Sequence, residues 1–72
     1  MAVKVLKKEK NSDKTMYKVE VFKKKFEFDL LENGNLDNIK DVTNGAQEEV
    51  AIGIAADLAY VFYNSEHIKI NE

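Results

Sequence analysis

Apolar and polar residues alternate through two segments in the first half of the chain, residues 15–22 and 25–30. Residues that alternate in this way point to opposite faces of a β-strand, so each segment predicts a strand with one buried face. The apolar residues of the two segments are Tyr17, Val19 and Val21, followed by Phe26, Phe28 and Leu30.

The two strands are close enough in sequence to form a hairpin. A two-residue loop at Lys23 and Lys24 keeps all the apolar residues on one face. The partners expected from this loop are Val21 and Phe26, Val19 and Phe28, and Tyr17 and Leu30. The loop lacks the glycine or asparagine that such turns prefer.

A further strand is expected before residue 11, where Val3 and Val5 alternate with lysines. Placing these two valines opposite Val21 and Val19 requires a loop of odd length. A three-residue loop with Asp13 in the left-handed conformation satisfies this requirement.

Asn33 and Gly34 provide the strongest turn signal in the chain, because both residues tolerate positive φ. The turn predicts a fourth segment over about residues 36–42. Leu36, Ile39 and Val42 recur there every three residues, which suits either a bulged strand or a helical turn.

A helix is expected after this segment, beginning near Asn44 and ending near Tyr63. Asn44 can cap it and Gln47 completes a capping box, with two glutamates in the first turn. Asn64 and Ser65 can end the helix, which leaves residues 67–70 for a short final strand.

These elements predict one α+β domain over residues 1–72. It consists of an antiparallel β-meander of three to four strands packed on one long C-terminal α-helix, with room for the short final strand. The expected core face of the sheet contains Val3, Val5, Tyr17, Val19, Val21, Phe26, Phe28 and Leu30.

The expected helix is apolar on more sides than one sheet can cover. A bulky stripe suited to the sheet contains Val50, Ala51, Ile54, Leu58, Val61 and Phe62. A second arc contains Ile52, Ala55, Ala56, Ala59 and Tyr63, and leaves mainly Glu49, Gly53, Asp57 and Tyr60 for water. Small residues let another helix approach closely, so we predict that the second arc forms a homodimer interface. The alternative is that its alanines are good helix formers left half exposed.

The size and composition of the chain favour association. A chain of 72 residues is near the lower limit for independent folding, and without cysteine it cannot use disulfides. The first ten residues contain lysines but no apolar segment, so we expect no signal peptide and a cytoplasmic location. The apolar run from Val50 to Tyr63 is too short to cross a bilayer, and no membrane association is expected.

Charge is unevenly distributed along the chain. Residues 1–25 contain nine lysines and three acidic residues, a balance of +6, whereas residues 26–72 have a balance of −8. Pairing between the halves, or between subunits, explains this asymmetry, as does a basic surface for an acidic partner or nucleic acid. The surface expected for a partner or nucleic acid is on the outward face of the strands and contains Lys4, Lys8, Lys18, Phe22 and Lys25.

Single-stranded nucleic acid is the alternative ligand for that outward face. Cations mixed with aromatic groups are typical of single-strand platforms. Glu20, Glu27 and Asp29 interrupt the cations and would repel phosphates. A meander followed by a dimerising helix is similar in general plan to small single-stranded-DNA-binding coactivator domains, a likeness of architecture that no motif residue carries.

No pattern in the sequence indicates catalysis, a metal or a cofactor. His67 is the only histidine and has no carboxylate partner at helical spacing. The segment after Asp29 resembles a calcium loop at its start but has Lys40 where that loop needs glutamate. We therefore expect a non-enzymatic, homodimeric protein-interaction module, with an unidentified protein as its further partner.

Overall fold

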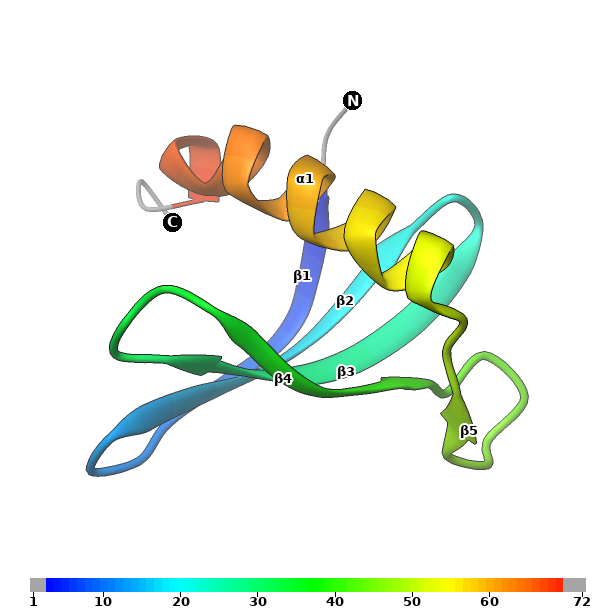
Figure 1. Cartoon of the computed structure of the whole chain (residues 1–72), viewed down its shortest axis with the longest axis horizontal. Coiled ribbons are helices and arrows are strands. Elements are labelled where there is room, and N and C mark those ends of the chain that lie inside the picture. Colours follow the sequence, from blue (N-terminus) through cyan, green and yellow to red (C-terminus); the bar gives the residue numbers. More distant parts are fainter. Residues whose placement is uncertain (1–2, 70–72) are drawn as a thin grey trace.

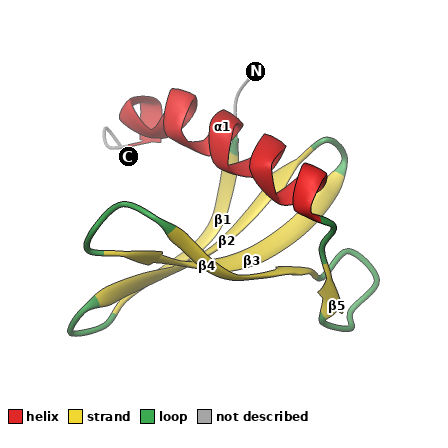
Figure 2. Cartoon of the chain, in the orientation of Figure 1, coloured by secondary structure: helices red, strands yellow, loops and turns green. Residues whose placement is uncertain are grey.

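The computed structural model describes the backbone of residues 3–69 and the side chains of residues 3–64. It contains a five-stranded antiparallel sheet in the order β1-β2-β3-β4-β5, with helix α1 across one face (Figures 1 and 2). The elements are β1 (Lys4–Lys10), β2 (Lys14–Val21), β3 (Lys24–Leu31), β4 (Leu36–Asp41), β5 (Glu48–Glu49) and α1 (Ile52–Lys69). The predicted α+β meander with one C-terminal helix is confirmed, and β5 is an addition to it.

The β2–β3 hairpin turns one residue earlier than predicted. Phe22 and Lys23 form its loop, with φ values of 58° and 61°. Positive φ at both loop residues is the signature of a type I′ turn, whose twist matches that of the flanking strands. Val19 consequently lies opposite Phe26, and Tyr17 opposite Phe28. The predicted partners were wrong by two residues, but a shift of two keeps every side chain on its predicted face.

The β1–β2 hairpin reaches its predicted alignment by a different route. Val5 lies opposite Val19, as expected. The predicted left-handed Asp13 is wrong, since Asp13 does not have positive φ. The Asn11 N–H donates to the Lys14 carbonyl at 2.8 Å, which leaves a loop of even length. A bulge between Val5 and Lys7 supplies the extra residue instead.

The β3–β4 turn forms at the predicted Asn-Gly pair. Gly34 has a φ of 93°, and its N–H donates to the Leu31 carbonyl at 3.0 Å. The Asn33 side chain accepts a hydrogen bond from the Asn35 N–H at 3.0 Å. Strand β4 then contains a bulge at Asn38, whose φ is 53°. Of the two interpretations of this segment, the bulged strand is therefore correct.

The helix begins at Ile52, eight residues later than predicted. Gly45 has a φ of 90° and its N–H donates to the Val42 carbonyl at 3.1 Å, which makes a turn where the first helical turn was expected. Glu48 and Glu49 then pair with β4 as the short strand β5. The predicted cap at Asn44 was wrong because strand pairing, a tertiary contact, outweighed the local capping signal.

The helix also continues past its predicted end, to Lys69. The Asn64 side chain does not end the helix but donates to the Tyr60 carbonyl one turn earlier, at 2.7 Å. The predicted final strand is thus wrong for residues 67–69, which are helical, and Ile70 lies outside the described residues.

Three aromatic rings occupy the centre of the core between sheet and helix. Phe62 from α1 packs edge-on against Tyr17 and Phe28, with both centroid distances at 5.1 Å. Tyr17 and Phe28 stack at 5.7 Å. Buried around them are Val3, Val19, Val21, Phe26 and Leu58. The helix is therefore held by Leu58 and Phe62, which the bulky stripe contained.

Other members of the predicted bulky stripe contribute less. Val61 is only partly buried, and Val50 packs on the core from a position before the helix. Ile54 is 45% exposed and Ala51 is exposed, contrary to prediction. The late helix start removes Val50 and Ala51 from the stripe. Leu58 and Phe62 are then the fully buried side chains of α1 among the described residues, and Val61 packs beside them.

The type I′ turn leads to a prediction about stability. A left-handed conformation costs about 1–2 kcal/mol for a residue with a Cβ, and Asn-Gly is the preferred pair for this turn. We expect the double variant Phe22→Asn and Lys23→Gly to be more stable by about 1–2 kcal/mol in urea unfolding. The matched control, Phe22→Ala with Lys23→Ala, removes the same side chains but keeps the strain. Equal unfolding midpoints for the two double variants would show that the turn is not strained.

Candidate interaction surfaces

Most of the side of α1 that faces away from the sheet is apolar. Ile52 is 89% exposed, Tyr60 70% and Tyr63 42%, and Ala56 is exposed between them. At about 100° per residue, these four side chains fall within an arc of about 80°. We call them the helix outer face. Asp57, which is also exposed, follows about 60° beyond Tyr60 at the border of this arc and is the only charged residue from Ile52 to Asn64.

Two alanines of the predicted dimer interface lie at the edge of this face instead. Ala55 and Ala59 are half-buried beside the core residues Leu58 and Phe62. Tyr60 is exposed, as predicted, and it lies next to the exposed members of the predicted interface. The rotation of α1 about its axis determines which residues face outward. The prediction placed the bulky stripe partly on Val50 and Ala51, which precede the helix, and so assigned Ala55 and Ala59 to the wrong side.

The sheet face away from the helix, which we call the outer sheet face, has charges that mostly alternate across the strands. Strand pairing aligns Lys4 with Glu20 and Glu20 with Lys25. A second row runs through Lys7, Lys18, Glu27, Lys40 and Glu49, and alternates from Lys18 onward, since Lys7 and Lys18 have the same charge. Opposite charges on neighbouring strands attract one another. This alternation does not form a continuous track of cations for a phosphate backbone.

Lys8 lies on the opposite side of the sheet from its predicted position. It pairs with the core residue Tyr17, and its Nζ lies 5.7 Å from the centroid of the Tyr17 ring. This geometry is a cation–π contact. The bulge at Leu6 reverses which residues of β1 face outward, so Lys7 takes the place predicted for Lys8.

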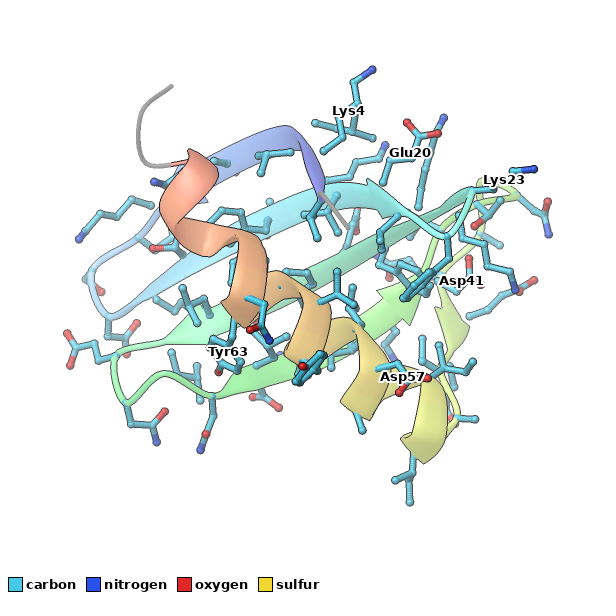
Figure 3. All side chains as sticks on the ribbon, turned by 90° about the horizontal axis from the view of Figure 1, so that it is seen from above. Lys4, Glu20, Lys23, Asp41, Asp57 and Tyr63 are labelled. Carbon is cyan, nitrogen blue, oxygen red and sulfur yellow. The ribbon has the colours of Figure 1, made fainter. Side chains whose placement is uncertain are left out.

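Phe22 and its neighbouring lysines occupy the β2–β3 turn at one end of the sheet. The Phe22 side chain is 41% exposed. Lys23 lies beside it in the turn, and Figure 3 shows Lys4 and Glu20 at the same end of the molecule. The structure thus gathers Lys4, Phe22 and Lys25 at this end, whereas Lys18 lies farther along β2.

A buried carboxylate that the sequence did not reveal lies on the outer side of β3. Asp29 is 9% exposed, and its Oδ2 accepts hydrogen bonds from Asn38 Nδ2 at 3.0 Å and Lys14 Nζ at 3.4 Å. The left-handed conformation of Asn38 in the β4 bulge accompanies this contact. An adjoining cavity of about 270 Å³ is lined by Met16, Glu27, Phe28, Asp29, Asn38, Lys40 and Gln47. Since Asp29 is satisfied within the protein, we assign it a structural role.

A second carboxylate ties the end of β4 to the β2–β3 turn. Hydrogen bonds from the Thr43 hydroxyl at 2.6 Å and the Thr43 N–H at 2.9 Å hold the pKa of Asp41 below its ordinary value, with a smaller effect from Lys24 at 3.8 Å. A lowered pKa in the folded state means that this contribution to stability is present at neutral pH. It is lost as the pH falls through that pKa. Thr43 Oγ1 also accepts from the Lys25 N–H at 3.0 Å.

Known proteins do not identify these surfaces. No known family, characterised protein or solved structure matches the chain. Within the described residues, no three histidine, cysteine, aspartate or glutamate side chains are grouped as metal ligands. In that same part of the chain, α1 does not have the length and apolar character needed to cross a membrane. His67 lies on the helix, with its side chain outside the described set.

Proposed function

We propose that the protein is a non-enzymatic interaction module that forms a homodimer through the helix outer face. The observation that carries this proposal is the exposure of Ile52, Tyr60 and Tyr63 on one uncharged face of α1. An exposed apolar face on a helix is normally covered by a partner. Here the sheet covers only the side that contains Leu58 and Phe62.

A second copy of the chain suits this face for an electrostatic reason. In a two-fold interface each subunit presents the same patch, so a charged patch would meet its own charge. The helix outer face contains no charge, and Asp57 at its border can stay in water. An uncharged stripe therefore favours self-association.

The sizes of the side chains also suit a close pair of helices. Gly53 and Ala56 lie between the bulkier Ile52 and Tyr60. Small residues allow helix backbones to approach, and bulky neighbours fill the grooves beside them. The tyrosine hydroxyls can remain hydrated at the rim while the rings are buried. Burial of this face would add stability that a domain of 72 residues otherwise lacks.

Sedimentation equilibrium of the wild-type chain and of Ala56→Glu tests this proposal. We expect the wild type to sediment as a dimer of the 8.2 kDa chain at micromolar concentration. Ala56→Glu should sediment as a monomer, because burying an unpaired carboxylate costs several kcal/mol. Since Ala56 is exposed in the single chain, the variant should fold normally, with a stability change within about 0.5 kcal/mol.

Asp57→Asn is the matched control for this experiment. It changes a neighbouring charge at the border of the helix outer face and should leave the dimer intact. A wild-type chain that remains at 8.2 kDa over the whole micromolar to millimolar range would overturn the proposal. So would an Ala56→Glu variant that dimerises as well as the wild type.

A further inference from the structure

The β2–β3 turn combines backbone strain with an exposed aromatic ring. Phe22 and Lys23 both have positive φ, which is unfavourable for residues with a Cβ. Such strain often marks functional positions, where the side chain is needed more than the relaxed backbone. Phe22 is 41% exposed, so its ring does not explain the strain by filling the core.

Three lysines without an ion-pair partner among the described residues lie in or beside this turn. Lys23 is in the turn, and Lys4 and Lys25 flank Glu20 on the adjoining strands. Within residues 3–64, none of these three lysines is in an ion pair, whereas Lys24 lies 3.8 Å from Asp41. The end of the sheet therefore contains more positive than negative charge, although the chain as a whole has a net charge of −2.

We propose that this end of the sheet binds single-stranded nucleic acid, with one unpaired base stacked on Phe22. Its contact set, which we call the turn cluster, consists of Lys4, Phe22, Lys23 and Lys25. The lysines would contact phosphates on either side of the stacked base, as in other single-strand sites. Lys4 and Lys25 are two strand spacings apart, about 10 Å. Across that separation, the two long lysine side chains can reach phosphates of the same extended nucleic-acid strand.

Single strands suit this site better than the other polyanions. The bases of a duplex are already stacked on one another, so a duplex offers no unpaired base that could stack on Phe22. Stable attachment to a membrane needs more apolar burial than one ring, or a larger basic patch. The turn cluster also confines binding to one end of the sheet, which avoids the alternating charges of the outer sheet face. The inference does not depend on the homodimer.

Fluorescence anisotropy with a labelled oligothymidylate of about ten nucleotides tests the proposal. We expect salt-sensitive binding by the full-length wild type, and an affinity loss of about tenfold for Phe22→Asn. Phe22→Asn also relaxes the turn, so it should raise the unfolding midpoint while it weakens binding. If the ring had only a structural role, affinity would not fall while the unfolding midpoint rises. Phe22→Tyr keeps an aromatic ring and should bind nearly as well as the wild type.

The lysines are tested separately by salt dependence. Lys23→Gln with Lys25→Gln should lower the slope of log affinity against log salt by about 1.4, since each phosphate contact on a single strand contributes about 0.7. Lys10→Gln, a charge change at the opposite end of β1, should leave both affinity and slope nearly unchanged.

Three results would overturn the proposal. One is the absence of salt-sensitive binding, and another is equal affinity for Phe22→Asn and the wild type. The third is binding to vesicles that contain phosphatidylserine, lost in Phe22→Asn, without binding to the oligonucleotide, which would assign the turn cluster to membranes. Repeating the titration with Ala56→Glu keeps the result independent of the dimer.

Discussion

Val19→Asp is expected to unfold the domain. Val19 is fully buried in β2, between Val5 on one side and Phe26 on the other. Aspartate at this position would place an unpaired charge in the core and remove the packing of a branched side chain. The destabilisation should be about 5 kcal/mol or more. A domain of this length has a total stability of about 4–11 kcal/mol, so most or all of it would be lost.

Glu20→Gln is the matched control, because the next residue along β2 points to the opposite face. Glu20 is partly exposed between Lys4 and Lys25 on the neighbouring strands, and its attraction to these two charges should contribute no more than about 1 kcal/mol. Circular dichroism during urea unfolding measures both variants. Similar midpoints for Val19→Asp and Glu20→Gln would mean that the alignment of β2 is displaced by one residue.

Phe62→Ala is expected to release the helix from the sheet. Phe62 is fully buried, and its ring closes the aromatic cluster with Tyr17 and Phe28. Removal of a buried phenyl ring costs about 3–5 kcal/mol, because burial is lost and a cavity remains. Few other residues anchor α1, so the loss should appear as reduced helical signal and as an earlier unfolding transition.

Tyr63→Ala, one residue farther along the same helix, is the control for Phe62→Ala. Its side chain is 42% exposed, and in a single chain its removal should cost no more than about 1 kcal/mol. Both variants are best measured in the Ala56→Glu background, where loss of the dimer cannot add to the effect. If Tyr63→Ala destabilised the monomer as much as Phe62→Ala, the helix would be rotated differently on the sheet.

The differences between prediction and structure have a common physical origin in the strand connections. Alternation with a period of two sets the face of each side chain, and a shift of two residues leaves that face unchanged. This is why Tyr17, Val19 and Phe28 are buried as predicted although the hairpin loop was misplaced. A bulge changes the alternation by one residue, and nothing in the local pattern marks the bulge at Leu6. Lys8 was consequently assigned to the wrong face.

Local helix signals were overruled in a similar way. Asn44 and Gln47 make a valid capping box only if the residues between them are helical. Instead, Gly45 takes a positive φ and Gln47 Nε2 donates to Glu27 Oε1 at 3.3 Å, across to a neighbouring strand. A contact twenty residues away in sequence cannot be detected from the spacing of capping residues.

The sequence by itself determined the antiparallel meander, the buried faces of β2 and β3, and the presence of a helix too apolar to be covered by one sheet. These properties depend on residue periodicity, which local backbone geometry converts directly into faces. The tertiary structure decided the positions of the β1–β2 and β2–β3 turns, the start of α1, the bulges at Leu6 and Asn38, and the rotation of α1 that buries Leu58 and Phe62, whereas the Asn33-Gly34 turn formed as predicted. Those features depend on which distant residues pack together, so Ala55 and Ala59 lie beside the core and Lys8 lies over Tyr17 for reasons that no single segment contains.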